Sequence, residues 1–212
     1  MKKIKIDTQT RTLLADKITP VQTYLQVRDK YRMCALLEST DFHLQKGKFS
    51  YIACDPIAEI KVDNRVITAE IDGEKHSLIS EKVDEAIQEF IDIFEVEDRD
   101  LPSSGIYGYV GYDAIPYFED IRFREKPKHA VADISMQFYR YILAFDHFHQ
   151  RVTFYENLLP GETSQLDKLI EETFKSMSIE QVFEVLKEKY GLQIAYDYTD
   201  VAGVIVDVQI QK

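Results

Sequence analysis

The chain has 212 residues, of which 45% are hydrophobic and 30% charged, so it can bury the core of one sizeable domain with a small appendage. Its formal net charge of -11 argues against nucleic acid and against an anionic membrane surface as partners. The N-terminus has basic residues but no apolar segment behind them, and no stretch approaches the about 20 apolar residues of a membrane span. We expect a cytoplasmic protein without nucleic-acid or membrane partners.

The first elements predicted along the chain are a short strand and a helix. Residues 4–6 alternate between apolar and polar types, which is typical of a strand. Residues 19–22 combine a capping Thr, a Pro suited to the first helical position and a Gln that completes a capping box. The helix is predicted to run to about residue 30, with the inward-facing residues Val21, Tyr24 and Leu25.

An antiparallel meander is predicted next. Residues 34–39 (CALLES) and 49–54 (FSYIAC) are two apolar, strand-like runs joined by a polar loop that is longer than a tight turn. Residues 58–63 and 65–71 alternate with period two and meet at the turn pair Asp63-Asn64. A second turn, Asp72-Gly73, leads to a short strand at residues 75–79.

The two cysteines of the chain, Cys34 and Cys54, lie within these apolar runs. Small buried cysteines are common in protein cores, so both are predicted to be reduced. A disulfide between neighbouring strands is the alternative, and it would imply export.

Apolar residues recur at helical spacing over residues 81–95 and again over 164–176, which predicts two amphipathic helices. Between them, residues 134–147 and 151–159 form a predicted hairpin. The segment GIYGYVGYDAIPYFED is too rich in glycine for a helix interior. It is predicted to form a strand in which Gly108 and Gly111 allow close backbone approach.

The last segment begins afresh after these elements. Ser178 is predicted to cap a helix that ends at Gly191, and strands follow at residues 192–197 and 204–210. The predicted domains are residues 1–177 and an appendage of residues 178–212. The predicted fold class is α+β, with a mixed, mainly antiparallel β-sheet and flanking helices.

Polar clusters along the chain do not predict catalysis. His147 and His149 could be two metal ligands on one strand face, but a site with two histidines is incomplete. The carboxylate runs at residues 97–100 and 118–120 are not paired with a nucleophile arrangement. We predict neither a catalytic residue nor a metal site.

Three segments follow one another along the chain in a recognisable order. The first is LLES with a polar loop and KFSYIACDP, the second is GIYGYVGYDAIPYFE, and the third is YILAFDHFHQRVTFYEN. In this order they resemble the N-terminal region of anthranilate synthase component I, with its GYxGYDxxxYFE element and the strand–FDH–strand hairpin after it. The resemblance covers about residues 5–175.

The resemblance implies a function. Component I converts chorismate to anthranilate in tryptophan biosynthesis, with ammonia supplied by a glutamine amidotransferase, component II. Magnesium and chorismate bind in a C-terminal chorismate-binding domain, and the N-terminal region contributes the site of feedback inhibition by tryptophan. On this basis the chain is expected to be the tryptophan-binding regulatory domain without the catalytic half, to hold no cofactor, and to make no anthranilate unaided.

The resemblance also implies site residues. A bound tryptophan needs hydrogen-bond acceptors for its ammonium group, an apolar wall for its indole ring and a basic partner for its carboxylate. The polar, apolar and basic residues of the first motif can supply all three. The tryptophan-binding residues are predicted to be Leu37, Glu38, Ser39, Lys48, Phe49, Ser50 and Tyr51. Candidates for packing near a domain interface are Gly108, Gly111, Tyr112, Asp113 and Tyr117.

Alternatives remain open at this stage. The equivalent region of aminodeoxychorismate synthase component I is a close one, and a non-catalytic interaction or scaffold module is one of a different class. The Glu-Ser pair could also be a simple strand end that meets solvent. An apolar patch left without a partner domain would favour a homo-oligomer. Residues 178–212 resemble the short helix–strand unit of secretin/TonB N-terminal domains and FecR C-terminal domains.

Overall fold

The computed structural model describes residues 3–15, 18–38, 49–76, 78, 82–121, 131–173, 177–178 and 205–206. The chain divides into two compact units, Met1–Ile170 and Glu171–Lys212. The division predicted from the sequence, between residues 177 and 178, stays a prediction.

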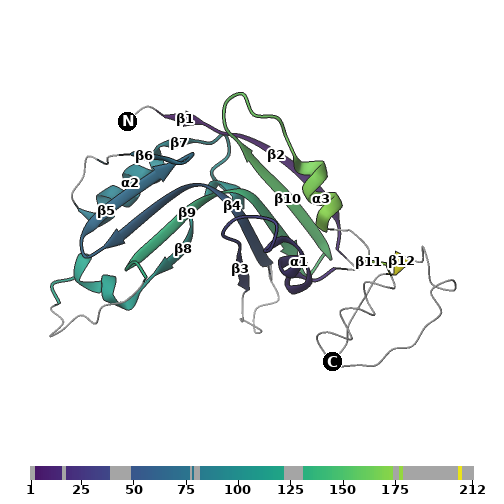
Figure 1. The fold of residues 1–212 in the computed structure, drawn as a ribbon, viewed down its shortest axis with the longest axis horizontal. Coiled ribbons are helices and arrows are strands. Elements are labelled where there is room, and N and C mark those ends of the chain that lie inside the picture. The colour runs from purple at the N-terminus through teal and green to yellow at the C-terminus, as the bar shows by residue number, and fades with distance from the viewer. Residues whose placement is uncertain are drawn as a thin grey trace. The chain divides into compact units, whose positions relative to one another are not determined.

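The first unit is built around one curled sheet of eight strands, each antiparallel to its neighbours (Figure 1). Its order is β2-β10-β9-β4-β5-β6, while β3 pairs with the first half of β4 and β8 with the first half of β9. A small parallel pair, β1–β7, lies outside this sheet. The predicted α+β class with a mixed, mainly antiparallel sheet is therefore confirmed. The strands of the large sheet are β2 (Asp7–Leu14), β3 (Ala35–Glu38), β4 (Phe49–Asp63), β5 (Val66–Ile71), β6 (Glu74–His76), β8 (Tyr107–Val110), β9 (Ile134–Asp146) and β10 (Arg151–Leu158).

Strand β4 is the first departure from the sequence prediction. Two separate strands were predicted, at residues 49–54 and 58–63, but the chain continues through both as one strand of 15 residues. The register to β9 shifts between Pro56 and Ala58, and Asp55 has a positive φ of 58°. Proline has no N–H to give to a ladder, so a bulge accommodates it without ending the strand.

Strand β2 was not predicted at all. Its sequence, DTQTRTLL, is mostly polar and exposed, and its pairing partner is β10, whose residues come more than 130 positions later. Thr8 Oγ1 donates to Asn157 Oδ1 over 2.9 Å, and the hydroxyls of Thr12 and Thr153 are also 2.9 Å apart. An edge strand of this kind buries too little apolar surface to show a period-two pattern.

Helix α1 (Pro20–Val27) begins as predicted, since Thr19 Oγ1 accepts a hydrogen bond of 3.2 Å from the backbone N–H of Gln22. Its inward face was predicted wrongly. Val21 and Leu25 are 48% and 41% exposed, whereas the buried residues of the helix are Pro20, Thr23 and Val27. The helix packs against β3 and β4 through this other face.

Helix α2 (Val83–Asp92) is shorter than the predicted span, and helix α3 (Leu166–Thr173) begins two residues later than predicted, while residues 174–176 lie outside the described residues. Phe90 of α2 belongs to a core with Phe138 of β9 and Phe94 of β7 (Phe94–Glu95). The rings of Phe94 and Phe138 stack with centroids 4.2 Å apart. This core also includes Ile6, which follows β1 (Ile4–Lys5), so the parallel pair is packed on the same apolar layer.

Two tight turns join β4 to β5 and β5 to β6. Positive φ values fall on Asn64 and Arg65 in the first turn, one residue later than predicted. In the second turn they fall on Asp72 and Gly73, as predicted. Pairs of positive φ values are typical of two-residue turns in twisted hairpins.

In the second unit the structure describes one antiparallel pair, β11 (Met177–Ser178) with β12 (Ile205–Val206). Ser178 lies in β11, and its predicted role as a helix cap stays a prediction because the residues that follow it lie outside the described part of the chain. Ile205 and Val206 lie in a strand within the predicted range 204–210. The predicted helix, Gly191 and the predicted strand 192–197 lie outside the described residues.

Candidate functional site

Strand pairing joins two segments that are separated in the sequence by a ten-residue stretch. Leu37 lies opposite Tyr51, and Glu38 lies opposite Ser50, at the end of β3 and the start of β4. Five of the seven predicted ligand-binding residues therefore lie on one pair of strands. Ser39 and Lys48 lie outside the described residues.

The five residues divide between the two faces of the sheet, because side chains alternate along a strand. Leu37, Phe49 and Tyr51 share one face, where the Phe49 and Tyr51 rings stack with centroids 6.0 Å apart and planes 18° apart. Burial raises the pKa of the Tyr51 hydroxyl, so it is a neutral hydrogen-bonding group at physiological pH. Exposed Glu38 and buried Ser50 share the opposite face.

The Ser50 hydroxyl has a partner that the sequence did not predict. Ser50 Oγ lies 2.8 Å from Nε2 of His147, which is in the turn between β9 and β10. His147 was considered only as a metal ligand, and its real neighbour depends on β4 pairing with β9. The FDH motif, residues 145–147, predicted this turn but did not indicate which strand would contact it.

The aromatic face continues inward from Tyr51. Tyr51, Tyr107 and Tyr155 pack around Tyr139, which lies in a small core with Ala53 and Ile142. Burial raises the pKa of both Tyr107 and Tyr139 to about 12. These hydroxyls stay protonated at neutral pH, so the face can bind rings and donate hydrogen bonds but cannot supply a general base.

The predicted interface residues lie on β8 and on the turn of 3₁₀-helix after it, η2 (Tyr112–Tyr117). A Cβ added at Gly108 would lie 2.0 Å from the Ser135 carbonyl oxygen, and one at Gly111 would lie 3.1 Å from that of Asp133. Both glycines thus allow the close backbone approach predicted from the sequence. Tyr112 is 75% exposed.

Tyr117, another of the interface candidates, is tied to its own unit. Its hydroxyl donates to the Asp133 carboxylate and accepts a hydrogen bond of 3.2 Å from the backbone N–H of Arg65. The Arg65 guanidinium also lies over the Tyr117 ring, 5.2 Å from its centroid. These contacts hold η2 against the turn between β4 and β5.

The two sets of predicted residues are far apart on the sheet. On β9, the partner of Ser50 is Phe145 and the partner of Gly108 is Met136, nine positions earlier. At about 3.3 Å per residue this is about 30 Å of strand. They therefore form two separate surfaces, and one small ligand cannot contact both.

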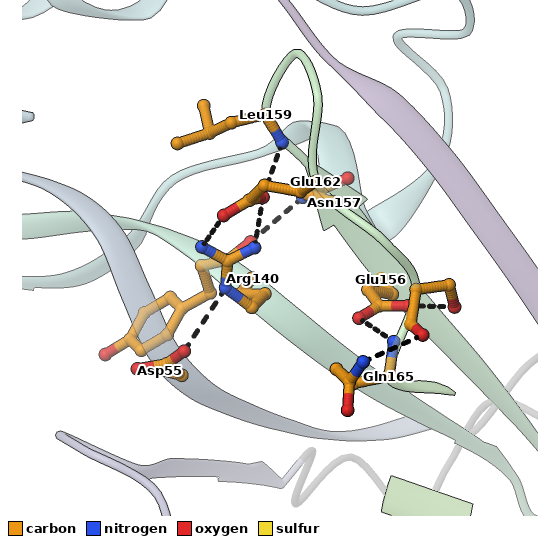
Figure 2. A network of polar contacts seen from close by, with 9 residues as sticks. Asp55, Arg140, Glu156, Asn157, Leu159, Glu162 and Gln165 are labelled. Carbon is orange, nitrogen blue, oxygen red and sulfur yellow. Dashed lines mark hydrogen bonds and ion pairs between the residues drawn. The ribbon is translucent and has the colours of Figure 1, made fainter. Parts of the chain in front are cut away.

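A cluster of charges near the middle of the sheet is structural (Figure 2). The Arg140 guanidinium binds Glu162 with both terminal nitrogens, one of them at 2.9 Å, and its Nε lies 3.3 Å from Asp55 Oδ2. The carboxylate of Glu156, which is 1% exposed, accepts hydrogen bonds from the Ser164 hydroxyl and, over 2.8 Å, from the backbone N–H of Gln165. These groups hold the start of α3 and the chain before it against the sheet. They use their hydrogen bonds for this structural role and not for binding a ligand.

Other features of the described residues do not form a ligand site with these strands. A hollow lined by Lys61, Asp63, Asn64, Val66, Thr68 and Ala132 lies on the β4–β5 hairpin, away from β3. Within the described ranges, no three metal-ligating side chains form a cluster. None of the helices in this part of the chain has the length and apolar character of a membrane span.

Comparisons with known proteins agree with the resemblance seen in the motifs. No family model matches the chain. Anthranilate synthase component 1 of Lactococcus lactis subsp. lactis (strain IL1403) is 28% identical over 188 residues, which cover 84% of this chain and 38% of that protein. The solved anthranilate synthase component I from Streptococcus pneumoniae TIGR4 is 22% identical with a TM-score of 0.45, over 82% of this chain and 36% of that one.

The sequence match is the stronger of the two comparisons. Most of this chain is similar to a part of anthranilate synthase component I, and the resemblance predicted from the motifs is confirmed in that sense. The chain spans about 38% of the length of the curated relative.

Proposed function

We propose that this chain is the amino-acid-binding, feedback-regulatory part of an anthranilate synthase component I, with L-tryptophan as its ligand. The similarity to a protein of that name supports the enzyme and its pathway. The name of this relative also favours the anthranilate branch over the aminodeoxychorismate branch. Catalysis and magnesium binding are assigned in this proposal to a chorismate-binding domain, and ammonia supply to a glutamine amidotransferase.

One observation carries the ligand proposal. The β3–β4 register brings the LLES segment and the KFSY segment together, so that Leu37 faces Tyr51 and Glu38 faces Ser50. The face with Leu37, Phe49 and Tyr51 supplies an aromatic and aliphatic surface for an indole ring. Glu38 lies on the opposite face of the sheet but at the end of β3, and its exposed carboxylate is proposed to bind the ammonium group around this strand end.

The proposal is tested by a chemical-shift titration of tryptophan into the labelled chain, a method that detects weak binding. Glu38→Gln removes the charge at nearly constant volume, and Ser39→Ala removes the hydroxyl predicted from the resemblance. Loss of a hydrogen bond to a charged group typically costs about 1.5–3 kcal/mol. Each change is therefore expected to weaken tryptophan binding by about one to two decades.

Two controls make the result specific. Glu70→Gln removes an exposed carboxylate from β5, away from β3, and is expected to leave tryptophan binding unchanged. Phenylalanine lacks the indole N–H and is expected to bind more weakly than tryptophan. If both amino acids bind equally, or if Glu38→Gln and Ser39→Ala bind tryptophan like the unchanged chain, the end of β3 is only a strand end.

The second surface, on β8 and η2, is proposed as the contact with the chorismate-binding domain. Apolar side chains are exposed there, at Tyr109, Val110, Tyr112, Phe118 and Ile121. Exposed apolar side chains on neighbouring segments favour association. In the 212-residue chain by itself, the same surface is proposed to bind a second copy, which gives a homo-oligomer.

A further inference from the structure

The two cysteines of the chain lie next to each other across the β3–β4 pair. The register sets Ala35 opposite Ala53, and one further step places Cys34 opposite Cys54. Both thiols are free, and the interaction between them is the largest cause of the shift in the pKa of each. A disulfide between neighbouring strands was the alternative that the sequence left open, and in the structure both cysteines are free.

The two thiols differ in their access to solvent. Cys54 lies in the middle of the sheet and is 0% exposed, whereas Cys34 lies just before β3 and is partly exposed. Cys34 Sγ lies 3.4 Å from the carbonyl oxygen of Tyr31, which accepts a hydrogen bond from the thiol. A reagent in solution can therefore reach Cys34 but not Cys54.

The two thiols also differ in acidity, and the more accessible thiol is the more acidic one. The hydrogen bond from Cys54 lowers the pKa of Cys34, and this effect outweighs burial and the nearby Asp55 and Asp29. The same hydrogen bond, together with burial, raises the pKa of Cys54 well above its ordinary value. The thiolate, which is the reactive form, is thus favoured on the accessible sulfur.

We propose that Cys34 and Cys54 form a redox-active dithiol, in which Cys34 reacts with a low-molecular-weight disulfide of the glutathione type and Cys54 closes an internal disulfide. The Cys34 thiolate attacks one sulfur of the reagent, forms a mixed disulfide and releases one thiol. Cys54 then loses its proton, attacks Cys34 Sγ and releases the second thiol. In total, the protein gives up two protons and two electrons, and the reagent disulfide becomes two thiols.

The position of the pair links it to the strand end described above. Cys34 precedes Leu37 by three residues, and β3 is the strand that carries the proposed ligand surface. A disulfide would fix the start of β3 to the centre of β4. Any effect of oxidation on tryptophan binding rests on the proposed function, whereas formation of the disulfide does not.

The test uses the full 212-residue chain, which contains no other cysteine. The reduced protein is incubated with oxidised glutathione, and its intact mass and free thiols are measured over time. The unchanged chain is expected to lose both thiols and the mass of two hydrogen atoms, with little stable adduct. Cys54→Ser is expected to accumulate one glutathione adduct, because the resolving thiol is absent. Cys34→Ser is expected to stay unmodified until denaturant exposes Cys54.

Two results would overturn the proposal. The unchanged chain could keep both thiols while Cys54→Ser is modified, or it could accumulate a stable adduct as Cys54→Ser does. Peptide mapping of the oxidised unchanged chain shows directly whether Cys34 and Cys54 are joined, so the answer does not depend on a variant that folds. If the disulfide forms but tryptophan binding is absent in both redox states, the dithiol stands and the proposed function fails.

Discussion

Gly108 shows at the scale of one residue how closely two strands of this sheet approach. The hydrogen that stands in place of a side chain faces the backbone of β9, and a methyl group would lie only 2.0 Å from a carbonyl oxygen. Because the contact is with backbone, no rotamer change can relieve it. The glycine-rich segment is therefore a requirement of strand packing, whatever it contacts on its other side.

Gly108→Ala is expected to lower the free energy of unfolding by about 1–3 kcal/mol or more, because β8 must shift away from β9. Gly105→Ala is the matched control, since a Cβ there would meet no atom closer than 3.7 Å and its φ of -90° suits any residue. That change is expected to stay within about 0.5 kcal/mol of the unchanged chain. Urea denaturation measures both. Equal stability of the two variants would mean that β8 does not pack as described.

At the scale of the element, β8 is a short strand whose described pairing is with β9. Tyr109 and Val110 are exposed on it, and Tyr112 of η2 and Phe118 just after η2 are exposed as well. An edge strand that shows apolar side chains is a surface where another polypeptide can add. This element, unlike β2 with its polar side chains, is suited to association.

Val110→Glu is expected to lower the fraction of oligomer at a given concentration, because a charge on this surface must be desolvated on association. Leu14→Glu, at another exposed apolar position at the end of β2, is expected to leave the oligomer unchanged. Light scattering after size-exclusion chromatography gives the mass of each variant, and thermal melting checks that both remain folded. A monomeric unchanged chain, or equal effects of the two changes, would contradict a role for β8.

At the scale of the whole molecule, the chain divides into two units, and the apolar clusters described above lie in the first of them. The large sheet, α1 and α2 all end before residue 171. Helix α3 crosses the division, and its Leu166 and Leu169 are buried.

A chain of residues 1–177 is therefore expected to fold and to melt in one cooperative transition. It keeps α3 whole, so it preserves the contacts of the helix start with Glu156. A chain of residues 1–163, which loses α3, is the comparison and is expected to melt at a lower temperature, since burial of Leu166 and Leu169 is lost. Calorimetry measures both. Loss of the cooperative transition in the 1–177 chain would show that the remaining tail belongs to the core.

The sequence by itself determined the features that depend on neighbours along the chain. The cap at Thr19, the hairpin of β9 and β10 and the turn at Asp72-Gly73 are local arrangements with local signals. The order of three motifs also pointed to anthranilate synthase component I, as the comparison with a relative confirms.

Only the tertiary structure decided the features that depend on strands distant in sequence. Thr8 is hydrogen-bonded to Asn157, 149 positions away in the sequence, and Ser50 is hydrogen-bonded to His147, 97 positions away, because strand pairing places them together. Cys34 meets Cys54 for the same reason, and β4 passes through Pro56 as a single strand because β9 supports it on both sides of the bulge. The period-two pattern of a strand shows which of its side chains are buried, but it does not show which strand lies beside it. The sequence therefore left the register between strands open.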